Sequence, residues 1–590
     1  MSYCADFGDS IGRQMATIRK IEIENFRGIK SLNWHPKPGL NCLIGSGDSG
    51  KSTILDAIDL CLGARRTFQF TDADFHGLAI AEPISITLTL GNLAPELKSI
   101  DGYGLYLRGF NVTTLELEDE PGAGLETVLS LNMRVESDLE PVWSILSDRT
   151  AAAGQTRNLS WSDRVALSPL RIGALSDHNL SWRRGSILNR LSDETADAST
   201  ALLAAAREAR KAFGVDADKK LGTALGIVTA VASDLGIDVG AKAKAELEAH
   251  SVSMTAGTIS LHDESGVPLR RLGVGSTRLM ISGLQQKNAT ESSILLVDEL
   301  EHGLEPHRII RFLDNLGAKQ KESPLQVFLT SHSPIAVREL TVEQLSVVRK
   351  AGGVHEVLWV GQHSDLQGTL RVYPEAFLAR AILVCEGASE VGLLRGIDQH
   401  RSAAGKPSMH AHGTCLVDAG GYTKIMPRAQ AFQQMGFKVA TFRDDDYRPD
   451  AAEEAAFEAA GGEIFKWRKD KKLEVELFES LPVPAVKTLL EKSLEDRSEQ
   501  EIDSQVRSHS KNAVTFARVE EELTKGELSQ ETRNALGCAA GGNKEGKKAW
   551  FKTVGEMEQI GRDVIWPNLD GSDKEFKDAV IALRRWCIGG

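Results

Sequence analysis

Residues 40–53 read LNCLIGSGDSGKST, a short apolar run followed by the pattern G-x-x-x-x-G-K-S. The apolar run predicts a strand and the residues from Lys51 to Leu62 predict a helix, so the glycines fall in the loop between them. In such a loop the backbone N–H groups surround phosphates, the lysine reaches the β- and γ-phosphates, and the Ser52 hydroxyl binds Mg²⁺. The stretch predicts a nucleotide site with the ligands Gly45, Gly47, Gly50, Lys51, Ser52 and Thr53.

A second motif downstream favours a nucleotide site over the alternative of a simple glycine turn. The apolar run Ile294–Val297 predicts a buried strand that presents Asp298 to the Mg²⁺ shell and Glu299 as a general base for an attacking water. After the next predicted strand, 327–329, His332 is placed to contact the γ-phosphate. ATP with Mg²⁺ is therefore the expected cofactor of this part of the chain.

The pattern of apolar residues predicts an α/β chain with two domains. Residues 17–24 alternate as a half-buried strand does, and repeated alternations from about 83 to 135 predict an antiparallel sheet. A stretch rich in Ala, Leu, Lys and Glu, 191–250, predicts helices inserted into the first domain. A new alternation of strands and helices starts at Ala381. The predicted boundaries are 1–155 and 256–370 for the two parts of the first domain, 156–255 for the helical insert, and 371–590 for the second domain with its helical end.

The composition excludes several classes of protein. The 590 residues are 42% hydrophobic and 26% charged, which is typical of a globular chain and excludes a disordered one. No apolar run approaches the roughly 20 residues of a membrane helix and no signal peptide pattern opens the sequence, so we expect a cytoplasmic protein without a membrane span. Seven scattered cysteines without C-x-x-C argue against disulfides and a zinc ribbon. The net charge of −13 leaves nucleic acid open, because an acidic body can carry a local basic groove.

Acidic residues follow two predicted strands of the second domain. The strand Ala381–Cys385 ends in Glu386, and the strand 438–442 is followed by RDDD. Asp444 and Asp446 point the same way from an extended backbone, so a parallel neighbouring strand brings Glu386 to them. Such acids repel one another unless a divalent cation binds, and oxygen ligands favour Mg²⁺ or Mn²⁺, which support phosphodiester chemistry. Solvated loop acids are the alternative. The expected metal ligands of this stretch are Glu386, Glu390, Asp444 and Asp446.

The nucleotide motifs resemble those of ABC-type ATPases of the SMC and RecF kind, down to the opening IENFRGI at 23–29. In that family a signature segment of one subunit completes the site of another, and residues 272–278, LGVGSTR, occupy the matching place. The resemblance therefore implies a dimer in which Gly275 and Ser276 contact the nucleotide. Asp48 in the phosphate loop and a signature without Ser-Gly-Gly-Gln depart from the family pattern and imply slow turnover.

The acidic strand ends resemble the TOPRIM domain of topoisomerases, DnaG-type primases, RecR-like proteins and OLD nucleases. Among these, the OLD family joins TOPRIM to an N-terminal ABC ATPase with a helical dimerisation insert, and this resemblance covers nearly the whole chain. The tyrosine-bearing DNA-gate domain of a topoisomerase and the zinc module of a primase have no counterpart in the sequence. The resemblance implies a nuclease in which Glu386, Asp444 and Asp446 are catalytic.

The second OLD subclass, which includes the nuclease subunit of the Gabija anti-phage system, has further acids and a lysine. By this resemblance Glu474 is a metal ligand, and the segment 543–552 supplies a catalytic lysine, Lys547 or, as second choice, Lys548. A solvated surface is the alternative for that segment. The run KWRKDKK at 466–472 places positive charge beside an aromatic residue, which suits DNA phosphates and base stacking but is equally typical of a plain basic loop.

The expected function is an ATP-regulated, divalent-metal-dependent DNA endonuclease. The resemblance also implies anti-phage defence, a homodimer or dimer of dimers, and a UvrD-like helicase as partner. The alternative is a non-cleaving, ATP-driven clamp or sensor of the SMC and RecF kind, which would bind DNA and leave it intact. Whether ATP licenses or restrains cutting is open at this point, since the family shows both.

Overall fold

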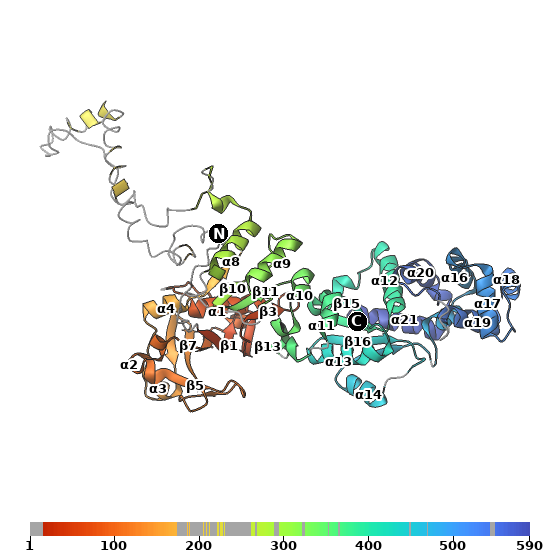
Figure 1. Ribbon diagram of the computed structural model, residues 1–590, viewed down its shortest axis with the longest axis horizontal. Helices are drawn as coiled ribbons and strands as arrows, with labels where there is room; N and C mark the ends of the chain where they lie inside the picture. Colours follow the sequence, from red (N-terminus) through yellow and green to blue (C-terminus); the bar gives the residue numbers. More distant parts are fainter. Residues whose placement is uncertain are drawn as a thin grey trace, which may run out of the picture. The chain divides into compact units, whose positions relative to one another are not determined.

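The computed structural model describes residues 16–589 except 66, 174–185, most of 187–260, 263, 266–267, 288–293, 321–324, 352, 364–365, 448–449, 469 and 543–548 (Figure 1). Of the predicted helical insert, 156–255, residues 156–173 are described and most of 174–255 lie outside the described residues, as do Lys547 and Lys548. The chain divides into two compact units, which are described one at a time. The first consists of Met1–Leu43, Gly50–Leu340 and Lys350–Val357, and the second of Ile44–Ser49, Thr341–Arg349 and Leu358–Gly590.

Parallel strands carry the nucleotide motifs of the first unit. Their order is β9 (Leu170–Ile172), β10 (Ile294–Val297), β11 (Gln326–Thr330) and β3 (Leu40–Ile44), and α1 (Lys51–Leu62) follows β3. All residues of β3, β10 and β11 are buried, as expected for parallel strands covered on both faces. These strands and α1 confirm the sequence prediction. The predicted boundary of the first domain part at residue 155 is too early, because β9 lies beyond it and pairs with β10 of the same sheet. The sequence pattern did not indicate β9, since a strand of three residues is too short to show an alternation.

Antiparallel strands make up the rest of the sheet in the first unit. Their order is β6-β5-β7-β4-β1-β2, with β8 beside β7 and β13 parallel to β2. The alternation predicted for 17–24 is confirmed, since Ile21 and Ile23 are fully buried and Glu24 is exposed. The antiparallel sheet predicted for 83–135 is confirmed by the pairing of β4 and β5 with β7. The bounds are β1 (Thr17–Phe26), β2 (Ile29–Trp34), β4 (Ile84–Gly91), β5 (Leu107–Phe110), β6 (Leu117–Glu118), β7 (Glu126–Val135), β8 (Pro141–Leu146) and β13 (Val354–Trp359). β12 is Leu345–Ala351, and most of its residues belong to the second unit.

Helices cover this sheet and position its motifs. α1 contacts β4, β7 and β11, so one helix packs on both the antiparallel and the parallel strands. α8 packs against α9 and β9, and α9 packs against α10. The helices are α2 (Ile100–Tyr103), α3 (Asp148–Ala152), α4 (Trp161–Leu167), α8 (Val274–Lys287), α9 (Pro306–Asn315) and α10 (Pro334–Glu339).

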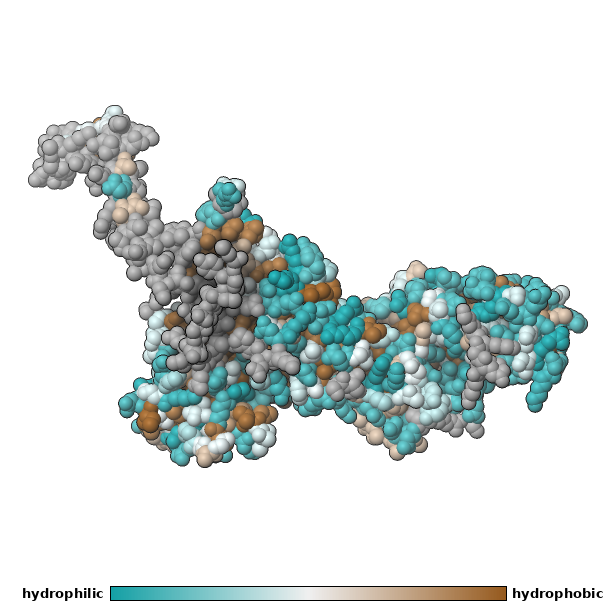
Figure 2. Space-filling model, viewed as in Figure 1, coloured by the Kyte–Doolittle hydropathy of each residue, from teal (hydrophilic) through white to brown (hydrophobic). Residues whose placement is uncertain are grey.

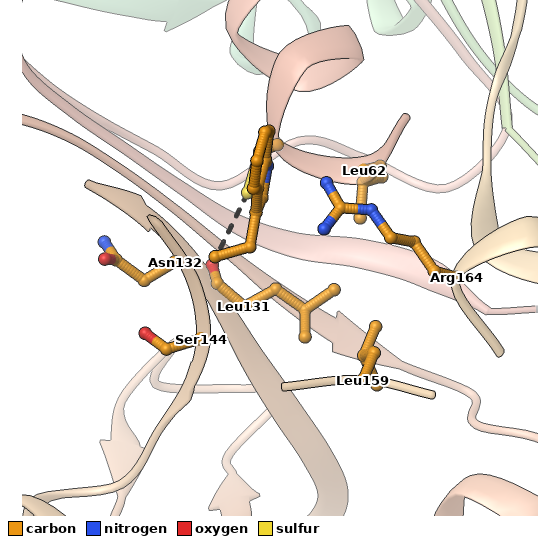
Figure 3. A pocket seen from close by; sticks show the side chains of 8 residues that line it. Leu62, Leu131, Asn132, Ser144, Leu159 and Arg164 are labelled. Atoms are coloured by element: carbon orange, nitrogen blue, oxygen red, sulfur yellow. Dashed lines mark hydrogen bonds between the residues drawn. The ribbon is translucent and has the colours of Figure 1, made fainter. Parts of the chain in front are cut away.

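A small cavity lies where α1 meets β7 and β8 (Figure 3). The indole of Trp143 donates to Leu60 O over 3.0 Å, and the Arg164 guanidinium lies 4.3 Å from the Trp143 ring centroid. Burial raises the pKa of the Cys61 thiol to about 12, so the thiol that lines the cavity is protonated and uncharged. The volume is about 20 Å³, which fits a single water and no nucleotide. Its lining is Cys61, Leu62, Leu131, Asn132, Trp143, Ser144, Leu159 and Arg164.

The second unit contains a four-stranded parallel sheet in the order β15-β14-β16-β17. β14 lies between β15 and β16, with Cys385 level with both Asp418 and Phe442 at the carboxyl ends. The predicted α/β alternation from Ala381 is confirmed. The bounds are β14 (Ala381–Cys385), β15 (Thr414–Asp418), β16 (Lys438–Arg443), β17 (Glu463–Lys466), α11 (Gln367–Val372), α12 (Ala388–Ala403), α13 (Ile425–Gln434) and α14 (Ala451–Ala459).

Helices follow this sheet to the end of the chain and share its hydrophobic core. α12 packs closely against α20, where a Cβ added at Gly396 would lie 2.1 Å from Glu558 O, so only glycine permits this contact. α15 packs against α19. The helices are α15 (Leu473–Ser480), α16 (Val483–Asp496), α17 (Glu499–His509), α18 (Phe516–Lys525), α19 (Gln530–Gly541), α20 (Val554–Ile560) and α21 (Lys574–Cys587).

The surface of each unit is mainly hydrophilic on the face shown in Figure 2, with small apolar patches such as those around α2, α3 and β5. Scattered apolar side chains of this kind are normal on protein surfaces. Among the described residues, no helix combines the length and apolar character that crossing a bilayer requires.

Candidate functional site

The phosphate loop runs from Gly45 to Gly50 between β3 and α1. Gly45 has φ 141°, and a Cβ there would lie 2.6 Å from the Val348 carbonyl oxygen, so the loop requires glycine. Gly50 has φ 89° directly before α1. Lys51 is buried, with 5% of its surface exposed, at the first position of the helix. Gly47 has open space around its Cα, and Thr53 is half-buried in the first turn of α1.

The structure brings together the two predicted Mg²⁺ ligands of the nucleotide site, Ser52 of α1 and Asp298 after β10. The Ser52 hydroxyl donates to Asp298 Oδ1 over 3.0 Å, and the Thr330 hydroxyl donates to the same oxygen over 2.7 Å. Arg171 of β9 lies 3.4 Å from Asp298 Oδ2 and also pairs with Asp56 of α1 at 2.5 Å. The roles of Arg171 and Thr330 could not be predicted from the sequence, because β9 and β11 become neighbours of β10 only in the folded sheet.

Glu299 and His332 lie beside this pair at the ends of β10 and β11. Glu299 has φ 46°, and its side chain is 59% exposed. Burial and the nearby Lys51 lower the pKa of His332, which favours a neutral imidazole able to donate or accept a hydrogen bond. Glu301, which the sequence analysis missed, accepts from the His332 N–H at 2.8 Å and from the Ser331 hydroxyl at 2.7 Å. The carboxylate of Glu301 therefore holds the histidine loop in place.

The segment that resembles the ABC signature starts α8 and contacts the loop after β10. A Cβ on Gly275 would lie 2.2 Å from Gly303 O, and the Ser276 hydroxyl accepts from Arg308 at 3.0 Å. Arg278 is fully buried and donates to three carbonyl oxygens of that loop at 2.7–2.9 Å, those of Asp298, Glu299 and His302. The Arg278 guanidinium thus holds the backbone of the loop that carries Glu299, the predicted general base.

Three carboxylates meet at the carboxyl end of the second sheet. One oxygen each from Glu386, Asp444 and Asp446 lies within 4.8 Å of the others. The Asp444 N–H donates to Glu386 Oε2 at 3.0 Å, and the Leu473 N–H donates to Asp444 Oδ1 at 2.9 Å. Asp446 is the most exposed of the three, at 36%, and Lys472 lies 3.5 Å from it. The sequence prediction that strand-end acids gather here agrees with this geometry.

The acids of this cluster carry an electrostatic cost. Burial, and then the neighbouring Asp446, raise the pKa of Glu386 above its usual range. Burial and the carboxylates of Glu390, Glu474 and Glu386 raise the pKa of Asp444 strongly. A bound divalent cation would neutralise this repulsion, and a set of carboxylate oxygens matches the ligands that Mg²⁺ and Mn²⁺ prefer. The residues present therefore fit a divalent metal ion.

A second acidic pair lies deeper beside the cluster. Glu474 of α15 is fully buried and forms an ion pair with Lys552 Nζ at 2.5 Å. Glu390 in the first turn of α12 accepts from the Gly387 N–H at 2.9 Å. Burial, and next the Glu474 carboxylate, raise the pKa of Glu390 to about 8. Glu390 and Glu474, which the sequence predicted as metal ligands, thus lie close enough to the cluster to raise the pKa of Asp444.

Lys552 is the lysine that the described structure places at these acids. It belongs to the segment 543–552 from which the sequence analysis selected Lys547 and Lys548, both of which lie outside the described residues. Its position is set by the preceding aromatic residues. Trp550 is fully buried and donates through its indole to Gln505 at 2.7 Å, and the Phe551 carbonyl accepts from Ser389 at 3.3 Å. The Trp-Phe pair before Lys552 was the signal in the sequence.

Asp445 lies between Asp444 and Asp446 in the chain, and its partners lie outside the cluster. It lies 3.4 Å from the buried Arg443, and its Oδ2 accepts from the Asp470 N–H at 3.1 Å. Arg443 also pairs with Glu454 at 2.6 Å. Asp445 is therefore held by partners outside the cluster that Asp444 and Asp446 form with Glu386.

The basic run 466–472 corrects one expectation. Trp467 is only 3% exposed and stacks on Phe576 with centroids 5.5 Å apart, so it belongs to the core and cannot stack on a base. Arg468 pairs with the buried Glu476 at 2.5 Å. Lys466 and Lys472 keep partly exposed side chains. The charge pattern alone could not show that the aromatic ring points inward.

Comparisons with known proteins match two parts of the chain. Residues 40–338 match the family described as "AAA domain, putative AbiEii toxin, Type IV TA system", and residues 377–446 match "Overcoming lysogenization defect protein-like, TOPRIM domain". The DNA replication and repair protein RecF of Nitrosococcus oceani is 44% identical over 55 residues, which are 9% of this chain and 15% of RecF. The chromosome partition protein Smc of Methanocaldococcus jannaschii is 38% identical over 64 residues, which are 11% of this chain and 6% of Smc.

Among solved structures, Smc head domains match the chain at low sequence identity and low TM-score. The Pyrococcus furiosus Smc head bound to the C-terminal domain of ScpA has a TM-score of 0.35 at 14% identity, covering 60% of this chain and all of that one. The SMC head domain from Thermotoga maritima has a TM-score of 0.27 at 14% identity, covering 58% and 98%. The chain spans 15% or less of the curated relatives named above. By its two domain matches, the chain belongs to the AAA-domain ATPase family and has the ATPase–TOPRIM architecture of the OLD family.

Proposed function

We propose that this protein is an ATP-regulated, divalent-metal-dependent DNA endonuclease. The observation that supports this most directly is the cluster of Glu386, Asp444 and Asp446, whose oxygens lie within 4.8 Å of one another at the ends of adjacent strands. Nuclease chemistry on phosphodiesters commonly uses such oxygen-rich metal sites. The OLD-like TOPRIM match over 377–446 covers all three acids.

The side chains divide the work by position. Glu386, Asp444 and Asp446 would hold the metal, which when bound lowers the pKa of water and neutralises charge on a phosphate. The ammonium group of Lys552, paired with Glu474, adds a fixed positive charge beside the acids for the charge that develops during cleavage. Asp446 is the exposed member, so DNA would approach from its side.

The ATP site supplies regulation in this proposal. Lys51, Ser52 and Asp298 would bind the Mg²⁺-nucleotide, and Glu299 would orient the attacking water. Gly275 and Ser276 would contact the nucleotide of a second subunit, so hydrolysis would need a homodimer. Anti-phage defence and a UvrD-like helicase partner, suggested by the Gabija-like resemblance, belong to this proposal as its biological setting.

The second candidate function is a non-cleaving, ATP-driven DNA clamp. The similarity to RecF and Smc over 55 and 64 residues favours it, since those proteins are named for DNA replication and repair and for chromosome partition. In a clamp, the raised pKa values at the TOPRIM acids would have no catalytic consequence. The two candidates differ in whether DNA is cut.

Cleavage of supercoiled plasmid tests the proposal. We expect the wild type to nick or linearise DNA in Mg²⁺ or Mn²⁺, and the variant Glu386→Ala/Asp446→Ala to leave it intact. Glu453→Ala, which removes an exposed acid at the start of α14, is the matched control and should cut normally. Intact plasmid with wild type and measurable ATP hydrolysis would favour the clamp.

Reactions with and without ATP then show the direction of control. Lys51→Ala should reduce ATP hydrolysis by about 1000-fold, because the ammonium group that contacts the β- and γ-phosphates is lost. Cutting by this variant that matches wild type at every ATP concentration would contradict regulation through this site.

A further inference from the structure

Two tyrosine rings form an exposed pair at the carboxyl end of the second sheet. The Tyr422 and Tyr447 side chains are 41% and 47% exposed, and their ring centroids lie 3.8 Å apart with 39° between the planes. Within the part of the chain that the structure describes, the other large hydrophobic residues that are exposed are leucine, isoleucine and valine, so these two are the exposed aromatic ones. Exposed aromatic rings that are held in place are unusual, because aromatic residues are mostly buried.

Both rings lie on loops that are joined to residues of the acidic cluster, one along the chain and one through a backbone hydrogen bond. Tyr447 directly follows Asp446, and its carbonyl oxygen accepts from the buried Arg443 at 3.1 Å. Tyr422 follows Gly421, whose N–H donates to the Glu386 carbonyl at 2.9 Å. The rings therefore reach across the end of β14, one from the loop after β15 and one from the loop after β16.

Glycines give the β15 loop the path that this arrangement needs. Gly420 and Gly421 have φ 69° and 116°, values that other residues rarely adopt. The Gly420 N–H donates to Asp418 Oδ1 at 2.7 Å, and Arg428 donates to the Asp418 carbonyl at 2.8 Å. The loop is thus fixed by hydrogen bonds on both sides of its turn, and Tyr422 is presented by a defined backbone.

We propose that the Tyr422–Tyr447 pair stacks on an unpaired base of the DNA strand whose phosphate lies at the acidic cluster. This inference rests on the proposed nuclease function and deepens it by naming the form of the substrate. Tyr447 directly follows Asp446 in the chain, and the Gly421 N–H beside Tyr422 donates to the Glu386 carbonyl. Both rings therefore lie on loops joined to the acidic cluster, and a base next to a phosphate bound there is within their reach. Aromatic rings bind bases of any sequence through their faces.

The need for an unpaired base follows from the geometry of stacking. In a duplex both faces of each base are covered by its neighbours, so a protein ring reaches a face only at an end, a gap, a loop or a base turned out of the helix. Trp467, the aromatic residue of the basic run, is buried and unable to do this. The tyrosine pair is therefore the aromatic surface beside the acids that can contact DNA, and it favours strands with unpaired bases.

Binding to strands with and without bases tests this inference. The probes are fluorescein-labelled dT20 and a strand of the same length made of abasic sites, measured by fluorescence anisotropy in Ca²⁺ with gels to show that the strands stay intact. We expect wild type to bind dT20 about 10-fold more tightly than the abasic strand. Tyr422→Ala/Tyr447→Ala should bind both equally, and Tyr422→Phe/Tyr447→Phe should restore the preference because the rings remain.

Two controls separate stacking from a structural role. Val372→Ala removes an exposed apolar side chain that precedes β14 and belongs to neither loop, and it should keep the wild-type ratio. The stabilisation of each variant by Mn²⁺, measured as a thermal shift, should equal that of wild type. If the double alanine variant loses that shift, Tyr422→Ala alone, which leaves the residue beside Asp446 unchanged, decides by the same binding ratio.

The inference and the nuclease proposal can fail separately. A wild type without preference for bases, or an alanine variant that retains it, overturns the stacking proposal even if plasmid is cut. A tyrosine-dependent preference in a protein that cuts no DNA supports stacking and refutes the nuclease.

Discussion

The two acidic sites of this protein differ in how their charges are balanced. At the ATP site, Asp298 accepts from Ser52 and Thr330 and lies 3.4 Å from Arg171. At the TOPRIM site, burial and mutual repulsion raise the pKa values of Glu386, Asp444 and Glu390. The charge of Asp298 is thus balanced by hydrogen-bond donors and an arginine of the same chain, whereas the acids of the TOPRIM site carry excess negative charge.

This difference indicates what each site requires. A phosphate loop receives a ligand that brings both its negative charge and its Mg²⁺, so the protein side can be neutralised beforehand by its own donors. The TOPRIM acids need the positive charge itself, and Lys552 supplies only part of it. The metal should therefore affect the stability and pH behaviour of the second unit directly.

Among the changes that bear on this contrast, the largest effect is expected at Lys552. Lys552→Met should reduce the single-turnover rate of DNA cleavage by about 100-fold, because it removes the fixed positive charge beside the cluster. It also leaves the fully buried Glu474 without its ion-pair partner, so the second unit should be less stable. ATP hydrolysis should change little, since Lys552 takes no part in the ATP site.

Lys547→Met and Lys548→Met are the matched controls, measured in the same cleavage assay and by thermal unfolding. Each removes one lysine from the segment that the sequence analysis selected. A larger loss of cleavage in either control than in Lys552→Met would return the catalytic role to the lysine first predicted.

A smaller effect is expected at Arg278 of the ATP site. Arg278→Met leaves three backbone carbonyls of the loop after β10 without donors, which costs about 1–3 kcal/mol for each buried group left unsatisfied. The loop carrying Glu299 should lose its fixed geometry, and kcat for ATP hydrolysis should fall by about 10-fold with a smaller change in KM.

Steady-state kinetics and nucleotide binding check this expectation. Arg278→Lys should recover part of kcat, since an ammonium group can still donate to some of the carbonyls. Arg311→Met, on the outer face of α9, is a control that removes an exposed arginine. An Arg278→Met variant with wild-type kcat would show that the guanidinium serves packing alone.

Local motifs made the main features of the fold predictable. The phosphate loop, the buried strands and the acids at strand ends each depend on residues close together in the sequence, so spacing alone places them. Glu386 could be expected beside Asp444 because parallel neighbouring strands end at the same edge. The short strand β9 was too brief for periodicity to detect, which explains the early boundary at residue 155.

Contacts between distant segments could not be read from the sequence. Arg278, Glu301 and Lys552 act through partners on other elements, and no spacing rule connects them. Base stacking by Trp467 was one of two interpretations of the basic run, and the burial of the ring excludes it, because a basic run does not show which way its aromatic ring points. Tyr422 stands 25 residues before Tyr447 in the chain, and only the order of β15, β14 and β16 brings the rings together.

The smallest predicted effect, a pH-dependent stabilisation by metal, addresses the contrast between the two sites most directly. Burial raises the pKa of Glu390 from 4.5 to about 8, so the folded metal-free protein binds a proton that the unfolded chain has released at neutral pH. Stability without metal should therefore be highest below about pH 4.5 as far as this group is concerned, and should fall as pH rises to about 8. The loss is at most about 1.4 kcal/mol per pH unit for one group, or a few degrees in Tm.

Bound Mg²⁺ should reverse this trend, because it competes with the protons for the same carboxylates and binds better once they have left. Thermal unfolding between pH 6 and 8.5, with and without Mg²⁺, should show a metal-induced rise in Tm that grows with pH. Glu390→Gln should reduce both the loss without metal and the growth with metal, and Glu386→Ala/Asp446→Ala should abolish the rise. A rise in Tm that is the same at every pH would mean that the acids bind metal without first giving up protons, and the electrostatic difference between the two sites would then have no effect on stability.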